Sequence, residues 1–383
     1  MSLKVYHVVR QYHPSIGGLE DVVYNIAQQQ LADGAQTPVI VTLDRLFCGD
    51  AQRLPAREIR EGVEVIRLPY RGSSRYPLCP KVLGVLGEAD VVHVHGVDFF
   101  FDFLAWTRFW HGKPLLASSH GIYFHTPFAS GLKKVFFNTV TRLSALAYRK
   151  IVATSDNDGR LFRQICADSR VEVIENGVNL TKFRQTASRE RLQPVIIYFG
   201  RWSENKGLLE TLALFACLHR HAPQWRLIIA GREYDHDADE LSRLAQELGV
   251  AEAVQIVPSP SNADLAALIA QASYFICQSH HEGFGLAAIE AMSAGLYPLL
   301  SHIPPFAKLV AATGLGLLLG RNQVEADSQA ILARHQALAV DYPAVAHQLV
   351  QSVQPYSWVQ TAQRYLQHYR DMAKTDHSME TSL

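Results

Sequence analysis

Two glutamates flank a glycine-containing turn in HHEGFGLAAIEAMSAG, residues 280–295. The preceding YFICQS is apolar and typical of a strand, whereas the residues from Leu286 onward are helix formers that end at Gly295. The sequence therefore predicts a strand, a turn that contains Glu282, and a helix that contains Glu290. At the carboxyl edge of an open α/β sheet, the start of such a helix offers free N–H groups to an anion such as a diphosphate. The two carboxylates would then hold neutral, hydroxyl-bearing parts of the same ligand.

Two cations follow a strand-like run in YFGRWSENKGL, residues 198–208. Parallel strands end at one edge of their sheet, so Arg201 and Lys206 can converge on an anion at the predicted helix start. This combination would stabilise a diphosphate leaving group without a metal ion. Taken singly, each cation is explained as a solvated loop charge and Glu290 as a surface helix residue. Their joint placement at matching strand ends favours a binding site.

Strands alternate with helical stretches along the 383 residues, which predicts parallel, doubly wound sheets. The first series is VYHVV, PVIVTL, VEVIRLP, DVVHVHG, PLLASSHG, KIVATS and VEVIENG, and the second is PVIIYFG, WRLIIAG, AVQIVP, YFICQS and YPLLSH. The chain is too long for one core, and we expect two Rossmann-like domains, residues 1–185 and 186–357. A helix is expected over about 358–374, and residues 375–383 are predicted to be a disordered tail.

Composition excludes several classes of protein. Lys plus Arg and Asp plus Glu both total 36, so the overall charge indicates no particular partner. The five cysteines are scattered without a CxxC pair, which fits reduced thiols better than disulfides or a zinc site. The sequence has no signal-peptide pattern and no uninterrupted apolar run of about 18 residues. We expect a cytoplasmic protein, or one that lies on the cytoplasmic side of a membrane.

The motifs together resemble those of a known family. EGFGLAAIE is similar to the E-x7-E element of retaining glycosyltransferases of the GT-B fold, family 4, and FGR-x4-KG resembles that family's donor-phosphate cations. PSIGGLE, NGV and AGR also fall in the family's order. The resemblance implies an α/β, GT-B fold in which two Rossmann-like domains face each other across a cleft. The first would bind the acceptor, the second would bind a nucleotide sugar, and the last helix would cross back to the first.

The same resemblance implies roles for individual residues. Glu282 would contact the donor sugar and Glu290 the ribose. His120, in LLASSHGIYFHT, would lie near the reacting sugar carbon; the alternative is a histidine bonded within its loop. The implied catalytic residues are His120, Arg201, Lys206 and Glu282. The implied substrate-binding residues are Gly17, Gly18, Asn176, Gly283, Phe284, Gly285, Leu286 and Glu290.

Metal binding is not expected. His93 and His95 share one face of a strand, but no third ligand is evident, so a structural role is favoured. DND at 156–158 and DHD at 235–237 resemble the metal-binding DxD of other glycosyltransferases. We interpret the first as a helix cap and the second as a surface turn. The nucleotide sugar is then a substrate, and no cofactor is needed.

No acidic residue occurs between Asp102 and Asp156, although many basic residues lie there, which predicts an anionic partner for the first domain. Residues 132–150 form an amphipathic helical pattern. The face assigned to the core comprises Leu132, Val135, Phe136, Val140, Leu143, Leu146 and Ala147. The face assigned to the acceptor and an anionic membrane surface comprises Lys133, Lys134, Phe137, Arg142, Tyr148 and Arg149. The aromatic segment 98–110 is either a buried helix, which is favoured, or part of that surface; nothing resembles a nucleic-acid module.

A narrower resemblance concerns VYHVVRQYHPSIGGLEDVVYN, FFNTVTR and EAMSAGLYPLLSHIPPF. These are similar to the α-mannosyltransferases of xanthan- and acetan-type exopolysaccharide assembly. The resemblance implies mannose transfer from GDP-mannose to a polyprenyl-diphosphate-linked saccharide. Pro258 stands where many family members have Gly, and Lys308 lies in a region where they often have Glu, so the resemblance does not carry the family's contact with the base over to this chain. The alternatives are a UDP-linked donor or another acceptor, a nucleotide-sugar epimerase of the same architecture, and a non-catalytic nucleotide-sugar sensor.

Overall fold

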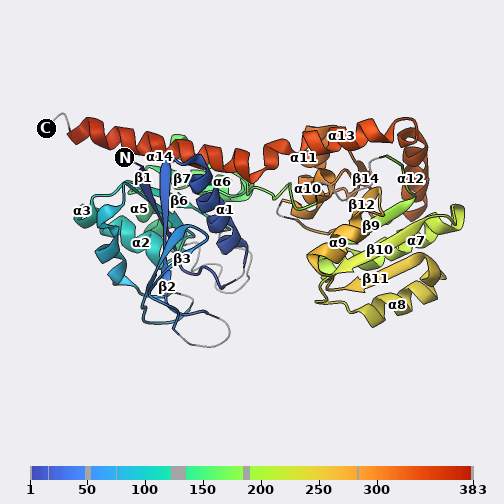
Figure 1. Ribbon diagram of the computed structural model, residues 1–383, viewed down its shortest axis with the longest axis horizontal. Helices are drawn as coiled ribbons and strands as arrows, with labels where there is room; N and C mark the ends of the chain where they lie inside the picture. Colours follow the sequence, from blue (N-terminus) through green and yellow to red (C-terminus); the bar gives the residue numbers. More distant parts are fainter. Residues whose placement is uncertain are drawn as a thin grey trace. The chain divides into compact units, whose positions relative to one another are not determined.

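The computed structural model describes residues 2–15, 17–47, 53–74, 76–121, 135–183, 190–282 and 284–380, without the side chains of 375–380. Its internal contacts divide the chain into two units, which are drawn in Figure 1. Unit 1 combines residues 1–177 with 358–383, and unit 2 comprises residues 178–357. The first division falls after Gly177, ahead of the predicted boundary after residue 185. The return to unit 1 begins at Trp358.

Unit 1 is built on an eight-stranded sheet in the order β3-β4-β2-β1-β5-β6-β7-β8, in which only β3 runs antiparallel to its neighbour. The strands are β1 Leu3–Val9, β2 Gln36–Leu43, β3 Arg57–Arg60, β4 Val63–Leu68, β5 Val91–His95, β6 Leu115–Ser118, β7 Lys150–Ala153 and β8 Val171–Val173. The chain first adds strands on one side of β1 and then returns to its other side with β5. Ligands of open α/β sheets bind at the carboxyl ends of strands where the order reverses in this way.

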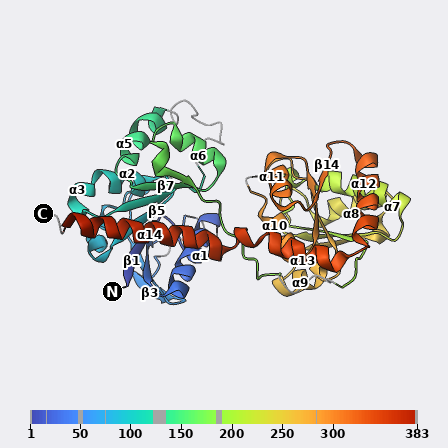
Figure 2. The same cartoon turned by 90° about the horizontal axis from the view of Figure 1, so that it is seen from above.

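Helices cover this sheet, and the last helix of the chain is one of them. They are α1 Gly18–Asp33, η1 Pro80–Glu88, α2 Phe99–Trp106, α3 Arg108–His111, η3 Phe137–Thr141, α5 Arg142–Ala145, α6 Asp156–Arg163, η4 Asp168–Arg170 and α14 Trp358–Glu380. Figure 2 shows α14, in red, lying across unit 1 beside α1. Its Trp358, Tyr365 and Tyr369 share a buried cluster with Val5 and Val91. The helix continues through 375–380, the first part of the segment predicted to be disordered.

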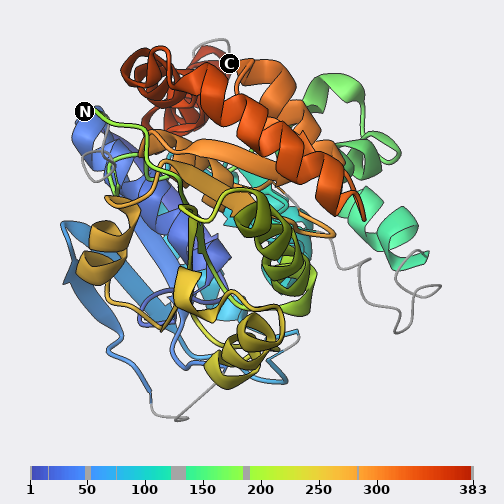
Figure 3. The same cartoon turned by 90° about the vertical axis from the view of Figure 1, so that its right-hand side faces the viewer.

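Unit 2 is built on a six-stranded parallel sheet in the order β11-β10-β9-β12-β13-β14. The strands are β9 Val195–Phe199, β10 Arg226–Gly231, β11 Val254–Pro258, β12 Tyr274–Cys277, β13 Tyr297–Ser301 and β14 Leu317–Leu319. The helices are η5 Glu204–Lys206, α7 Leu208–His221, α8 Ala238–Glu247, η6 Ala251–Ala253, α9 Asn262–Ile269, α10 Leu286–Ser293, α11 Pro304–Thr313, α12 Val324–Leu338, α13 Tyr342–Ser352 and η7 Gln354–Tyr356. Figure 3 turns this unit toward the viewer, with helices on either side of the strands. The strand order reverses between β9 and β12.

The segment around η3 and α5 packs with the face opposite to the one predicted. Phe137 and Tyr148, assigned to the membrane face, are buried at 5% and 1% exposure. Val135, Phe136, Leu143 and Leu146, assigned to the core, are exposed. The prediction of which face is buried was therefore wrong. Lys133, Lys134 and Leu132 lie outside the described residues, whereas Arg142 is exposed and Arg149 donates to the Met372 carbonyl of α14 at 2.8 Å.

Buried polar contacts with α2 explain the reversed packing. Ser144 Oγ donates to Asp102 Oδ1 at 2.7 Å, and Tyr148 Oη donates to the Phe101 carbonyl at 2.8 Å. The rings of Phe101 and Tyr148 also stack with centroids 4.4 Å apart. Burial raises the pKa of Asp102, and the hydrogen bond from Ser144 opposes that rise. A buried carboxylate needs hydrogen-bond donors such as Ser144. The face of residues 135–149 that carries Ser144 and Tyr148 is therefore buried against α2, and the large apolar side chains of the opposite face remain exposed.

The two peptide segments that join the units run side by side. Val178 donates its backbone N–H to the Tyr356 carbonyl at 2.7 Å. Directly beyond this pair, Gly177 lies against Trp358, and a Cβ on Gly177 would come within 2.7 Å of the Trp358 Cα. Only glycine allows this close approach, so Gly177 lets Trp358, the first residue of α14, pack directly against the preceding connection.

Replacing Gly177 with alanine should destabilise unit 1 because the added Cβ would contact both the ring and the backbone of Trp358. We expect a loss of about 1–3 kcal/mol, the usual cost of overpacking, measured by urea unfolding. Gly84→Ala is the matched control, since a Cβ there meets nothing within 4 Å. That variant should stay within about 0.5 kcal/mol of the parent protein or exceed it slightly. Equal stability of the two variants would contradict the assigned contact.

Candidate functional site

The loops that follow β9 and β12 are joined in unit 2, as expected for strand ends at one sheet edge. The side chain of Asn205 makes most of the connection: Nδ2 donates to the His281 carbonyl at 2.7 Å, and Oδ1 accepts from the His281 N–H at 3.0 Å. His280 also donates its N–H to the Asn205 carbonyl at 2.8 Å. The described parts of residues 200–207 and 278–285 therefore lie together at one sheet edge, and they contain five of the predicted site residues: Arg201, Lys206, Glu282, Phe284 and Gly285.

Lys206 and Glu282 meet at this surface. Lys206 Nζ lies 2.5 Å from Glu282 Oε1, and Ser279 Oγ donates to the same oxygen at 2.8 Å. Their side chains are only 22% and 14% exposed. Partial burial makes the attraction stronger than that of a surface pair. In this arrangement the ammonium and the carboxylate neutralise each other, so an arriving anion would have to take over Lys206.

Arg201 lies on the same loop, and its backbone is held in place. Tyr198 Oη donates to the Arg201 carbonyl at 2.8 Å, and the next residue, Trp202, donates its N–H to the Arg232 carbonyl at 2.8 Å. The Arg201 guanidinium lies over the exposed ring of Tyr234, with its carbon 4.8 Å from the centroid. This cation–π contact orients the guanidinium while leaving its N–H edges available to an anion.

The start of α10 has the backbone that the motif predicts. Gly285 adopts φ 82°, and a Cβ there would lie 2.6 Å from the ring of Phe306, so both conformation and space require glycine. Leu286 begins the helix and is partly exposed, whereas the Phe284 ring packs against Tyr356 with centroids 5.7 Å apart. The predicted site residue Gly283 lies outside the described residues.

Glu290 lies farther along α10 and is partly buried. Burial raises the pKa of its carboxyl group, and the nearby ammonium of Lys182 opposes that rise. A carboxylate in such a place is stabilised by hydroxyl donors. The helix therefore offers its N–H groups at Leu286 and a carboxylate one to two turns later, as the sequence predicts.

In unit 1, His120 follows β6 and has a left-handed backbone, with φ 50°. Asp158 holds the residues on both sides of it: Oδ2 accepts from Ser119 Oγ at 2.6 Å and from the Gly121 N–H at 3.0 Å. Residues held in this sparsely populated conformation cluster at functional sites. Asp158 was not singled out as a site residue, because DND was interpreted as a helix cap. The cap of α6 is in fact Ser155, which accepts from the Asp158 N–H.

The ring of His120 contacts a group of buried histidines. Its Nε2 lies 3.0 Å from His95 Nδ1, and His95 Nε2 lies 2.9 Å from His7 Nδ1. Burial lowers the pKa of His7 to about 4 and of His120 to about 3, and it lowers the pKa values of His93 and His95 well below 6.5. These imidazoles are therefore uncharged near neutral pH.

Two clusters in the described part of the chain have side chains close enough to share a metal ion. In the first, His7, His93 and His95, every ring nitrogen already has a hydrogen-bond partner; His93 contacts Tyr369 Oη at 2.7 Å and Ser118 Oγ at 2.8 Å. This supports the structural role expected for His93 and His95, with His7 as the third member that the sequence pattern missed. The second cluster joins α7 to α12 and comprises Cys217, His221 and Glu325. The DHD segment caps α8 through Asp237.

The remaining predicted substrate-binding residues lie at loops of unit 1. Gly17 precedes α1 and Gly18 is its first residue, while Ser15 Oγ donates to the buried Glu20 at 2.8 Å and closes that loop. Asn176 lies just before the crossing to unit 2. Its Oδ1 is buried and, among the described residues, has no hydrogen-bond partner. A buried amide oxygen without a partner is available to a ligand.

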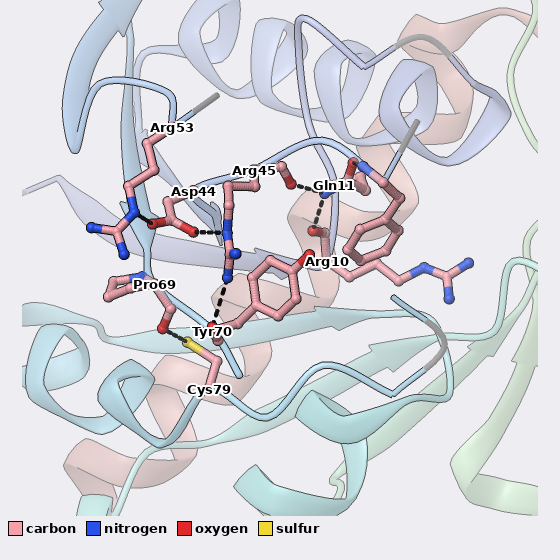
Figure 4. Close-up of polar contacts among 9 residues, drawn as sticks. Arg10, Gln11, Asp44, Arg45, Arg53, Pro69, Tyr70 and Cys79 are labelled. Atoms are coloured by element: carbon pink, nitrogen blue, oxygen red, sulfur yellow. Dashed lines mark hydrogen bonds and ion pairs between the residues drawn. The ribbon is translucent and has the colours of Figure 1, made fainter. Parts of the chain in front are cut away.

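Three arginines that the sequence analysis did not single out lie at the carboxyl edge of the unit 1 sheet, as Figure 4 shows. Arg45 donates to Asp44 at 3.4 Å and to the Tyr70 carbonyl at 2.8 Å, and Arg53 lies 3.5 Å from the same carboxylate. The guanidinium of Arg10 lies near the ring of Phe47. Position was the available signal for two of them, since Arg10 directly follows β1 and Arg45 lies two residues beyond the end of β2.

Gln11 connects the loops that carry these arginines. Its Nε2 donates to the Arg45 carbonyl at 3.0 Å, and its Oε1 accepts from the Phe47 N–H at 2.9 Å, which Figure 4 displays beside Arg10. One buried amide therefore fixes the loop after β1 against the loop after β2. The edge of unit 1 is in this way a rigid, basic surface.

Both units match known protein families. Residues 16–182 match the family described as Glycosyltransferase Family 4, and residues 181–333 match Glycosyl transferases group 1. A protein of Xanthomonas campestris named GDP-mannose:cellobiosyl-diphosphopolyprenol alpha-mannosyltransferase is 48% identical, over 99% of both chains. A protein of the same name from Komagataeibacter xylinus is 41% identical, over 97% of this chain and 94% of the relative.

Solved structures agree on the architecture. A glycosyltransferase from Rickettsia africae superposes with a TM-score of 0.70, at 18% identity, over 97% of this chain and 99% of its own. Anabaena HepE in complex with UDP and glucose superposes with a TM-score of 0.65, at 19% identity, over 96% of this chain and all of its own. At these identities the likeness concerns the fold alone, which is GT-B as predicted.

Protonation of the buried histidines should destabilise the protein in acid. Their pKa values are lower in the folded state than the usual 6.5, so the unfolded chain binds more protons. The stability that they contribute is complete above about pH 6.5 and is lost as the pH falls toward 4. The raised pKa of Asp98, about 6 through burial, acts in the opposite direction. We therefore compare variants rather than one curve: urea unfolding of His7→Gln should lose less stability between pH 6.5 and 4.5 than that of the parent protein.

Parallel stability curves for His7→Gln and the parent protein over this range would show that His7 is not buried in its neutral form.

Proposed function

The chain belongs to glycosyltransferase family 4, and we propose that it transfers mannose from GDP-mannose, with retention at the anomeric carbon, to a polyprenyl-diphosphate-linked saccharide. The curated relatives that carry this activity in their names are 41–49% identical along nearly the whole chain. The site residues of both units are consistent with this reaction. Assembly of a bacterial exopolysaccharide is the process that this acceptor implies.

The observation that carries the proposal is the contact between Lys206 and Glu282 at the joined ends of β9 and β12. When a nucleotide sugar binds, its diphosphate takes Lys206 Nζ, and Glu282 turns to the hydroxyl groups of the sugar. The pair thus holds both groups at the strand ends before the substrate arrives, and binding exchanges their mutual contact for contacts with the substrate. Glu290 and the N–H groups at the start of α10 hold the ribose and the phosphates.

In the proposed reaction, the bond between the anomeric carbon and the diphosphate oxygen breaks, and its electron pair leaves with the nucleoside diphosphate. A hydroxyl oxygen of the acceptor forms the new bond on the same face of the sugar. Its proton passes to the departing diphosphate. Arg201 and Lys206 stabilise the charge that develops on that leaving group, and we assign His120 to a hydroxyl group of the sugar.

We further propose that this stabilisation needs no divalent metal ion. Arg201 and Lys206 supply two positive charges on one loop, and the start of α10 adds its N–H groups. No acidic cluster takes part in this arrangement, because Glu282 is already paired with Lys206 and Ser279. Transfer that continues unchanged in excess EDTA would support this part of the proposal.

We propose an anionic membrane surface as the place where unit 1 meets its lipid-linked acceptor. Among the described helices, none has the length and apolar content that crossing a membrane requires. Large apolar side chains are nevertheless exposed just before η3, in and just after α5, at the end of α2 and on α3, where Phe109 and Trp110 are 99% and 81% exposed. The sequence from 103 to 155, to which these residues belong, contains arginines and lysines but no acidic residue. Exposed aromatic and basic side chains together suit a negatively charged lipid surface.

The exposed set replaces the membrane face predicted from the sequence. It comprises Trp106, Phe109, Trp110, Val135, Phe136, Leu143 and Leu146. The basic residue Arg142 of the original prediction remains exposed among them. At the carboxyl edge of the same unit, Arg10, Arg45 and Arg53 supply positive charge that suits the diphosphate of the acceptor.

Replacing Lys206 or Glu282 with alanine should reduce mannose transfer at least about 100-fold, because each removes a group that contacts the donor. Transfer is measured as radiolabel from GDP-mannose that becomes extractable into organic solvent with a membrane lipid extract. Lys4→Ala is the matched control, since Lys4 and Glu88 are also 2.5 Å apart but lie exposed in unit 1. Circular dichroism should show both site variants folded. Full activity of either site variant would overturn the role assigned to that residue. A preference for a UDP-linked sugar would overturn GDP-mannose as the donor.

Replacing Phe109 and Trp110 together with serine should weaken binding to vesicles that contain phosphatidylglycerol by about tenfold or more, since two exposed aromatic side chains are lost from the interface. Sedimentation with the vesicles measures the bound fraction. Ile59→Ser is the control, because Ile59 is 79% exposed on β3, away from these helices. Binding of the parent protein should also decrease in high salt. Equal binding of the double variant and the control would place the membrane contact elsewhere.

A further inference from the structure

A chain of side-chain hydrogen bonds runs through the interior of unit 1 from the last helix to the site histidine. Its members, in order from α14, are the Leu366 carbonyl, Gln36, Gln30, His7, His95 and His120. All of them except His120 are almost completely buried. They come from α14, β2, α1, β1, β5 and the loop after β6, so no short sequence motif contains them.

The direction of this chain is set at the end that lies on α14. A backbone carbonyl can only accept, so Gln36 Nε2 donates to Leu366 at 3.1 Å. The other amide atom of Gln36, Oε1, must then accept, and it does so from Gln30 Nε2 at 3.1 Å. This leaves Gln30 Oε1 to accept from His7 Nε2–H at 2.7 Å. The two amides therefore impose one tautomer on His7.

The same reasoning passes through the histidines. Each neutral imidazole has one donor and one acceptor nitrogen. His7 donates through Nε2, so its Nδ1 accepts from His95 Nε2–H at 2.9 Å. His95 Nδ1 in turn accepts from His120 Nε2–H at 3.0 Å. His120 is left with an unprotonated Nδ1, which has no hydrogen-bond partner among the described residues.

We propose that Gln30, His7 and His95 are positioning residues that lock His120 in the Nε2–H tautomer, so that its Nδ1 can only accept a hydrogen bond from a substrate hydroxyl group. Asp158 adds the second constraint, since it holds the backbone on both sides of His120. The ring and the backbone of one residue are thus fixed by separate sets of contacts. The role assigned to the substrate rests on the proposed function, whereas the tautomer itself does not.

The chain cannot work as a proton wire. A proton taken up at His120 could pass to His95 and His7. The next member is the side-chain amide of Gln30, which is too weakly basic to accept a proton. The direction of the hydrogen bonds is therefore fixed, and the imidazoles of His7, His95 and His120 stay neutral. Low pKa values produced by burial agree with this state.

An uncharged acceptor suits the chemistry proposed for the site. The sugar carbon gains positive charge as the diphosphate departs, as in other glycosyl transfers. A histidine that carried a positive charge beside this carbon would oppose that change. A neutral imidazole whose lone pair faces the sugar instead orients a hydroxyl group without adding charge. Imposing the wrong tautomer on a site histidine can cost orders of magnitude in rate, about 10⁴ in serine proteases.

Nitrogen NMR of the full chain, with 15N-labelled histidine, reports the tautomer directly. Two-bond proton–nitrogen correlations should show His120 protonated at Nε2 and bare at Nδ1, with the signal assigned through its absence in His120→Asn. In His95→Phe, which removes the acceptor, the His120 signals should move toward a mixture of tautomers. His95→Gln can still accept from His120 and donate to His7, so it should restore the parent spectrum.

The kinetic expectation separates positioning from folding. His95→Phe should lower kcat about 10- to 100-fold while the KM for the donor stays within about threefold, and His95→Gln should recover most of the loss. His93→Gln is the matched control. His93 is as buried as His95 and its ring contacts the His95 ring, but its hydrogen bonds go to Tyr369 and Ser118. It should lower stability without changing the His120 tautomer.

Three results would overturn the proposal. One is an Nδ1–H tautomer of His120 in the parent protein, and another is an unchanged tautomer in His95→Phe. The third is stoichiometric binding of zinc ions that removes the His7, His93 and His95 signals, which would make these residues a metal site. If no sugar is transferred but the spectra follow the expectation, the proposed function fails and the tautomer lock stands.

Discussion

Parallel pairing of β9 with β12 is the constraint on which the proposed donor site depends. Two strands that run side by side in the same direction must release their following loops at one edge. That edge receives a lysine from one loop and a glutamate from the other, and Asn205 binds the loops together before any ligand is present. Because the lysine and the glutamate satisfy each other, the free protein buries neither charge alone. The same contact keeps both groups at the place where charge is needed during transfer.

The sequence predicted this part of the molecule well because the information is local. Arg201, Lys206, Glu282 and Glu290 each lie at a fixed distance from a strand end or within one helix, and strand and helix patterns can be recognised from short windows. The packing of residues 135–149 could not be predicted in that way. Periodicity favoured the large apolar side chains for the core, but Asp102 and the Phe101 carbonyl on α2 needed partners, and Ser144 and Tyr148 supplied them. The histidine chain was also missed because its members lie on six separate elements.

Charge is arranged differently in the two units, and each arrangement follows from burial. At the edge of unit 2, Lys206 is partly exposed and is paired with Glu282. In the centre of unit 1, imidazoles are enclosed by strands and by α14, and burial keeps them neutral. In the proposed function, the surface of unit 2 binds a diphosphate and the surface of unit 1 contacts a sugar without adding charge to it.

The placement of α14 in unit 1 has a consequence for how the protein is made on the ribosome. Residues 1–177 are synthesised first, yet the cluster around Val5 and Val91 stays open until Trp358, Tyr365 and Tyr369 have been translated. Unit 2, whose residues are contiguous, can complete its core while the earlier unit still waits for its last helix. The nascent chain must therefore keep an unfinished apolar surface from aggregating throughout most of its synthesis, and the first domain to emerge is the last to be finished.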